Sequence, residues 1–264
     1  MTPDDARAPD TEPAGIQILP LRGAPEAQPG ADLAAMALEA AATSAVSLRA
    51  GDILVVTQKV VSKAEGLLID LKTIEPSDIA LRYAQQWGRD PRQVEVVLRE
   101  SARIVRMDRG LIIAETPHGL VCANAGVDAS NVAGSAGVSL LPIDSDESAR
   151  GIRQRLGERF GFEPAVIITD SFGRPWRRGI VNIAIGSAGI NPLLDYRGQF
   201  DEFGYELHAT TMAIIDEIAS AAELVMGKLD RRPVALVRGY AYQPGEDGAG
   251  AIALVREPES DMFR

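Results

Sequence analysis

Residues 165–179 read AVIITDSFGRPWRRG, and the interpretation of the chain starts from them. The apolar run at 166–168 predicts a buried β-strand. The run ends before Asp170, and Gly173 and Pro175 are expected to break regular structure. A carboxylate at a strand end, beside a hydroxyl and arginines, can hold a divalent cation next to phosphate, because hard cations prefer oxygen ligands and arginine matches phosphate geometry. An aspartate that caps a turn and pairs with an arginine explains this stretch equally well.

The bulk composition limits the classes of function. The chain has 264 residues, which suits one large domain or two interleaved small ones. A formal charge of -10 argues against nucleic acid as the main partner, although a local cationic cluster can still bind an anionic small ligand. One cysteine, Cys122, excludes an internal disulfide, and two histidines make an oxygen-ligated metal more plausible than a nitrogen-ligated one.

Several features favour a cytoplasmic protein without a membrane segment. No apolar run is long enough to span a bilayer. Residues 1–15 are rich in Pro, Asp, Ala and Glu, so they are predicted to form a disordered tail, and they lack the basic and apolar regions of a signal peptide. The remaining residues, 16–264, are predicted to form the folded part.

Hydrophobic periodicity and turn residues predict an alternation of helices and strands. Strands are expected at 16–21, 53–57, 103–107, 111–115, 120–123, 180–187 and 234–237, in addition to the strand that opens 165–179. Helices are expected at 31–48, 76–87, 90–101, 144–160 and 210–226. Residues 191–205 are expected to be a long irregular segment, which in a compact domain is often functional.

Two further segments place polar groups directly after a strand. Residues 58–66 carry Lys59, Ser62 and Lys63, which suit phosphate oxygens, although solvated lysines are the commoner outcome. Residues 124–131 carry Asp128, Ser130 and Asn131, which can ligate a cation or a nucleotide but also suit an Asx-type turn.

If the strands share a sheet, these polar ends converge on one site. Two carboxylates together with several cationic side chains are the groups that a site for metal-assisted phosphoryl transfer uses. A metal-dependent phosphatase and a nucleotide-binding module without catalysis are alternative interpretations of these residues. The sparse histidines support neither a Ser-His-Asp nor a Cys-His catalytic set.

Several long motifs, in the same order, closely resemble the coenzyme F-420 gamma-glutamyl ligase family. They are 55–66, 124–131 and 168–179, together with the early Leu19-Pro20-Leu21 and the later 217–228. The resemblance spans residues 16–239.

The resemblance implies a GTP-dependent ligase that adds L-glutamate to a deazaflavin with a phospholactate-type arm, through an acyl phosphate. It implies magnesium or manganese as cofactor, potassium as a candidate additional cofactor, and a homodimer. We therefore expect an α+β fold, with mixed sheets flanked by helices in two interleaved subdomains, that forms a dimer.

Residue roles follow from the matched motifs. Asp128 and Asp170 resemble metal ligands, and Ser171 resembles a ligand of a second metal. The expected GTP contacts are Leu19, Pro20, Leu21, Arg22, Gln58, Lys59, Lys63 and Asn131.

One position departs from the family pattern. After Met226-Gly227 the family can place an acidic ligand of the second metal, and here that position is Lys228, with Asp230 as a candidate substitute. Separately from the resemblance, the arginines of the opening stretch are candidates for steering the acidic substrate. They are Arg174, which we assign a catalytic role beside Asp170, and Arg177 and Arg178.

Overall fold

The computed structural model describes residues 15–129, 137–245 and 250–262. Most of the predicted N-terminal tail and the predicted GTP contact Asn131 lie outside these ranges. The described part has mixed α and β structure, which confirms the predicted fold class at that level. The division into two interleaved subdomains stays a prediction.

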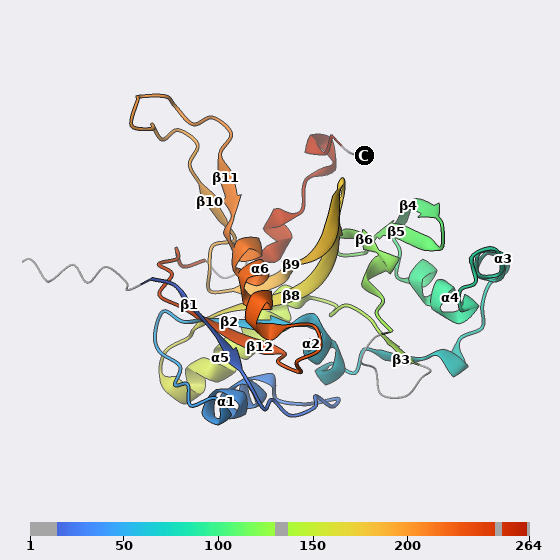
Figure 1. Ribbon diagram of the computed structural model, residues 1–264, viewed down its shortest axis with the longest axis horizontal. Helices are drawn as coiled ribbons and strands as arrows, with labels where there is room; N and C mark the ends of the chain where they lie inside the picture. The colour runs from blue at the N-terminus through green and yellow to red at the C-terminus, as the bar shows by residue number, and fades with distance from the viewer. Residues whose placement is uncertain (1–14, 130–136, 246–249, 263–264) are drawn as a thin grey trace, which may run out of the picture.

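A mixed five-stranded sheet forms the centre of the molecule (Figure 1). Its order is β1 (Gln17–Leu21), β12 (Val234–Arg238), β2 (Ile53–Thr57), β8 (Ala165–Arg174) and β9 (Arg177–Ala188). Only β2 and β8 run parallel, with Thr57 opposite Thr169, and the other pairs are antiparallel. The apolar runs of β12, β2 and β8 lie in the middle of the sheet, where both faces are covered.

Helices cover both faces of this sheet (Figure 1). Side chains alternate along β2, so that Leu54 and Val56 pack with α1 (Leu33–Thr43) and α5 (Ser145–Phe160). Ile53 and Val55 pack on the opposite face with α6 (Ile214–Met226). Successive side chains of β2 point to opposite faces, and both faces are covered by helices, which explains why Ile53 to Val56 are all apolar.

The residues between β2 and α5 build smaller elements beside the main sheet. The helix α2 (Gln58–Ala64) starts directly after β2, followed by β3 (Leu68–Asp70), which pairs with β7 (Gly137–Ser139). Between these two strands the chain forms α3 (Asp78–Trp87), α4 (Pro91–Arg99), and the three-stranded sheet of β4 (Arg103–Asp108), β5 (Leu111–Glu115) and β6 (Val121–Ala123). They enclose a separate hydrophobic cluster that includes Tyr83, Val94 and Ile112. Figure 1 places this cluster's helices and hairpin together at one end of the molecule.

The predicted helix starts in this part are confirmed by their caps. Ser77 accepts a hydrogen bond from the backbone N–H of Ala80, and Asp90 accepts one from Arg92 with Pro91 at the first helical position. The predicted hairpin around the turn at 109–110 is also confirmed.

The prediction for the end of β8 was wrong. The strand continues through Gly173 to Arg174, and Gly173 pairs with Ile180 in β9, so the chain turns only at 175–176. Asp170 consequently lies within the strand, just beyond a bulge between Ile168 and Thr169, and not at its end. Gly173 does not end the strand, because its backbone pairs with β9. The bulge before Thr169 changes the direction in which the side chains that follow it point.

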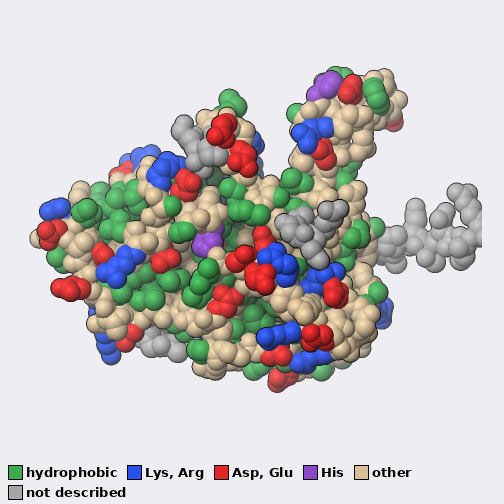
Figure 2. Space-filling model, turned by 180° about the vertical axis from the view of Figure 1, so that it is seen from behind, with side chains coloured by type: hydrophobic (Ala, Val, Ile, Leu, Met, Phe, Trp, Pro, Cys, Tyr) green, Lys and Arg blue, Asp and Glu red, His purple; other side chains and the backbone are tan. Residues whose placement is uncertain are grey.

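The prediction of a long irregular segment at 191–205 was wrong for residues 193–195, which form a strand, whereas residues 196–205 contain no helix or strand. Strands β10 (Leu193–Asp195) and β11 (Thr211–Ala213) pair and form the base of an arm that projects from the body (Figures 1 and 2). The following helix therefore begins at Ile214 and not at 210. The arm's outer part exposes Phe200, Phe203 and Tyr205.

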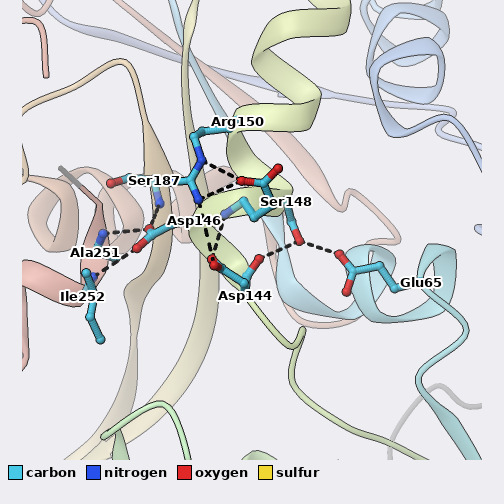
Figure 3. A network of polar contacts seen from close by, with 9 residues as sticks. Glu65, Asp144, Asp146, Ser148, Arg150, Ser187, Ala251 and Ile252 are labelled. Atoms are coloured by element: carbon cyan, nitrogen blue, oxygen red, sulfur yellow. Dashed lines mark hydrogen bonds and ion pairs between the residues drawn. The ribbon is translucent and has the colours of Figure 1, made fainter. Parts of the chain in front are cut away.

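A buried carboxylate holds the C-terminal segment against the sheet (Figure 3). Asp146, in the first turn of α5, accepts hydrogen bonds from the backbone N–H groups of Ser187 at 2.7 Å, Ala251 at 2.8 Å and Ile252 at 3.3 Å. The acidic start of α5, expected from the helix dipole, therefore also joins α5, β9 and the 3-10 turn Ala251–Leu254. In the described ranges, no helix combines the length and apolar character needed to cross a membrane.

Candidate functional site

A cleft of about 690 Å³ opens where β2 ends and β8 passes its bulge. Its walls come from five separate parts of the chain, which are residues 24–27, the β2–α2 junction, Asp128, the β8–β9 pair, and α6 with the segment after it. The parallel pairing of β2 with β8 places Lys59 and Asp170 on the same side of the molecule. Of the residues predicted for the site, the cleft brings together Gln58, Lys59, Lys63, Asp128, Asp170 and Ser171.

Two carboxylates form the acidic part of the cleft. Asp128 is held in place because its backbone exchanges hydrogen bonds with that of Ser139 in β7, and its side chain accepts a hydrogen bond from Lys59 Nζ at 2.7 Å. Burial, opposed by a backbone hydrogen bond from Ser171 and reinforced by the charge of Asp128, raises the pKa of Asp170 from 3.8 to about 6. Added positive charge nearby would therefore stabilise the ionised form of Asp170.

A chain of polar contacts runs from β8 through β9 to α6. Ser171 Oγ donates to Asn182 Oδ1 at 2.8 Å, and the two residues are cross-strand partners in β8 and β9. Asn182 Nδ2 donates in turn to Glu223 of α6 at 3.1 Å. Lys228 Nζ donates to Ser171 Oγ at 3.2 Å, so the chain ends on a cation.

The two remaining predicted cleft residues have strong partners within the protein. Lys63, which is buried, forms an ion pair with Glu26 and holds the pKa of that carboxyl below its ordinary value. The Gln58 amide donates to Ser62 Oγ at 2.7 Å and to the carbonyl of Leu140 at 2.8 Å. This amide therefore fastens α2 to the chain that leads into α5, and its expected contact with GTP stays a prediction.

Other predicted site residues lie away from the cleft walls. Leu19, Pro20, Leu21 and Arg22 are not among the lining residues, and the Leu21 side chain is fully buried. The chain reaches the cleft slightly later, at 24–27.

Arg174 also lies outside the cleft lining, because β8 carries it into the hairpin beyond Asp170. Its guanidinium donates to the carbonyl of Arg178 at 2.8 Å, and Arg177 and Arg178 are exposed on the same hairpin. The catalytic role assigned to Arg174 and the steering role of the other two stay predictions.

The cleft gathers residues that sequence patterns did not single out. They are Glu26, Thr169, Asn182, Glu223, Leu229, Arg231 and Arg232, among others. Asn182 could have been found only from the register of β8 against β9. The adjacent pair Arg231-Arg232 carries a local signal, since two neighbouring arginines after a helix suit an anion site.

The charge balance of the cleft differs from that of the whole chain. Five cationic side chains line it against four carboxylates, whereas the chain carries a net charge of -10. On the face shown in Figure 2, acidic and basic side chains are interspersed. A local excess of positive charge favours a polyphosphate ligand over a neutral one.

The carboxylate oxygens of the cleft suit one divalent cation such as magnesium. Among the described residues, no group of three or more His, Cys, Asp or Glu side chains could hold a metal. Asp128 and Asp170 nevertheless face the same space, and magnesium is commonly held by one or two carboxylates together with substrate phosphates. The two carboxylates therefore suit a divalent cation that arrives with a nucleotide.

A second cleft, of about 640 Å³, contains none of the predicted site residues. It lies beside Asp146 and the start of α5, the region of Figure 3, and its lining includes His118, Arg150 and Ile252. The polar groups at α5 are engaged with one another there, as Arg150 pairs with Glu147 at 2.8 Å.

Comparison with known proteins shows the family to which the chain belongs. A family model described as F420-0:Gamma-glutamyl ligase matches residues 23–239. Three proteins named Coenzyme F420:L-glutamate ligase are similar to the chain. That of Methanothermobacter thermautotrophicus is 43% identical over 95% of this chain and 99% of its own length, and that of Methanopyrus kandleri is 46% identical over 94% and 98%. That of Methanocaldococcus jannaschii is 46% identical over 81% of this chain and 85% of its own. The chain belongs to the F420-0:gamma-glutamyl ligase family.

Proposed function

We propose that the protein is a GTP- and metal-dependent ligase that joins L-glutamate to the terminal carboxylate of a deazaflavin, in coenzyme F420 biosynthesis. The names of its relatives support glutamate ligation. The observation that carries the nucleotide and metal part is the convergence of Asp128, Asp170 and Lys59 in one cleft with an excess of cations.

The chemistry requires an activated carboxylate, because a carboxylate is a poor electrophile until one of its oxygens becomes part of a leaving group. An oxygen of the acceptor carboxylate attacks the γ-phosphorus of GTP, and the bond from that phosphorus to the β-γ bridging oxygen breaks. GDP leaves and an acyl phosphate forms. The amine of glutamate then attacks the acyl carbon, phosphate leaves with the carbon–oxygen bond pair, and the amine loses a proton to give the amide.

The protein's contribution to these steps is positioning and neutralisation of charge. Lys59, Lys63 and the cations after α6 bind the phosphates and offset the repulsion between nucleotide and carboxylate. Asp128 and Asp170 would hold magnesium or manganese, which when bound neutralises further phosphate charge. Ala24, Pro25 and Ala27 add apolar surface to the lining of the cleft.

The protein acts as a cytoplasmic homodimer in this proposal. The exposed aromatic side chains on the β10–β11 arm, Phe200, Phe203 and Tyr205, support a contact with a second copy, because an isolated two-stranded ribbon is at best marginally stable in water. Light scattering of the purified protein tests this: a mass near 56 kDa, twice that of the 28.2 kDa chain, is expected, and a mass of one chain would contradict it.

The function is tested by measuring GDP release from purified protein while each component is omitted in turn. Release should require magnesium, the deazaflavin acceptor and L-glutamate together, and the product should be heavier by whole glutamyl units. Release of phosphate without glutamate would identify a phosphatase. Binding of GTP without any turnover would identify a nucleotide-binding module.

A further inference from the structure

Lys228 enters the cleft through the turn that ends α6. The helix ends at Gly227, whose φ of 65° is readily adopted by glycine and rarely by other residues. A Cβ at this position would also lie 2.6 Å from the Asp230 carboxylate. The tight turn brings Lys228 against β8, where its ammonium donates to Ser171 Oγ at 3.2 Å.

The Ser171 hydroxyl is already engaged on both sides. It donates its proton to Asn182 Oδ1 at 2.8 Å and accepts from Lys228. A hydroxyl has one proton and two lone pairs, so one lone pair remains for any further partner. A divalent cation bound there would lie beside an ammonium group, and two positive charges at such a distance repel each other strongly.

The carboxylate that could compensate for Lys228 is not available in the cleft. Asp230 is not a lining residue, and it forms an ion pair with Arg232 at 3.5 Å. Glu223 does line the cleft, but its carboxylate accepts from Asn182, and the Ser171–Asn182 pair lies between it and Lys228 in the chain of contacts. The described residues therefore fit one divalent cation at Asp128 and Asp170, and they do not fit a second one at Ser171.

We propose that the Lys228 ammonium takes the place of a second divalent cation, so that the cleft binds one metal ion and one fixed protein cation. The inference rests on the proposed function for the first metal position. Lys228 supplies its positive charge to the nucleotide phosphates from beside Ser171 and keeps that hydroxyl oriented. Nucleotide affinity should consequently depend on Lys228 even at saturating metal.

Native mass spectrometry with Mn²⁺ and GDP tests the inference by counting ions per chain. The wild type should carry one Mn²⁺ with its GDP. Lys228→Glu replaces the cation with a ligand next to Ser171 and should carry two, which would give a spin-coupled manganese pair in electron paramagnetic resonance. Lys228→Met should still carry one Mn²⁺ but bind GDP about tenfold more weakly.

The exposed Lys72, far from the cleft in sequence and absent from its lining, supplies the matched control. Lys72→Glu makes the same change of charge and should leave the count at one. Two Mn²⁺ in the wild type, none in the wild type, or only one in Lys228→Glu would overturn the inference. One Mn²⁺ per chain without glutamate-dependent GDP release would count against the proposed function alone.

Discussion

Replacing Asp170 with asparagine should make the metal-free protein more stable while abolishing turnover. The side chain is half-buried beside Asp128, and burial raises its pKa from 3.8 to about 6. At pH 7 the group is therefore ionised in an environment that disfavours the charge. A neutral amide of similar shape removes that penalty.

The magnitude follows from the shift in pKa. A shift of roughly two units, at about 1.4 kcal/mol per unit, corresponds to about 2 to 3 kcal/mol of stability lost on ionisation. The folded-state pKa is raised, so this stability is fully present below about pH 3.8 and is lost as the pH rises through about 6. The advantage of Asp170→Asn should thus be largest at pH 7 and nearly absent at pH 4.

Urea unfolding in the presence of a chelator measures this difference at both pH values. Asp128→Asn is the matched variant, because it removes the acceptor of the Lys59 ammonium at 2.7 Å and should not gain stability. Both variants should lose glutamate-dependent GDP release. Asp170→Asn that is less stable than the wild type at pH 7, or whose advantage is the same at pH 4, would refute the reasoning. Full activity of this variant at saturating magnesium would refute the metal-ligand role.

Three further predictions concern groups outside the cleft walls. Asp146→Ala leaves three backbone N–H groups, two of them buried, without their acceptor and should cost about 2 to 4 kcal/mol in urea unfolding. Asp144→Ala removes only an exposed helix cap and should cost about 1 kcal/mol; equal losses would contradict this. Hydrogen bonds from Ser77 and Arg99 lower the pKa of Glu95 to about 2. Glu95→Gln should therefore lower the free energy of unfolding by about 1 to 2 kcal/mol at pH 7, and by progressively less as the pH falls from about 4.5 towards 2. A loss of stability that does not change with pH would contradict the assignment. Burial raises the pKa of Cys122 to about 12, so the thiol should react with a dithionitrobenzoate at pH 8 only after unfolding in urea, and immediate reaction of the folded protein would be inconsistent with its packing.

The central sheet and most helices could be predicted from local patterns. Unbroken apolar runs such as 53–57 indicate strands covered on both faces, and the structure places this run in the middle of the sheet. Polar caps at Ser77, Asp90 and Asp144 mark where helices begin, because a side-chain oxygen there satisfies a backbone N–H that the helix leaves open.

Features that depend on the pairing of one strand with another could not be predicted in this way. Gly173 resembles a strand breaker until β9 pairs with it, and residues 211–213 resemble the start of a helix until β10 pairs with them. Local propensity is overruled in both places by hydrogen bonds to residues far along the chain or across a hairpin.

The candidate site shows the same division. Polar residues that follow apolar runs in the sequence pointed to Lys59, Asp128 and Asp170, which the structure brings together. Glu26 and Glu223 carry no local signal, because each reaches the cleft only through the packing of its segment against the sheet. The contact of Lys228 with Ser171 likewise appears only once α6 is placed beside β8.

The central claim is that the cleft activates a carboxylate as an acyl phosphate before glutamate attacks. It is tested most directly by supplying a deazaflavin acceptor whose terminal carboxylate is labelled with oxygen-18, together with GTP, magnesium and L-glutamate. The mechanism predicts that each phosphate released carries one labelled oxygen from the acceptor, and that its amount equals that of the glutamylated product. Unlabelled phosphate, released in excess of the product, would contradict it.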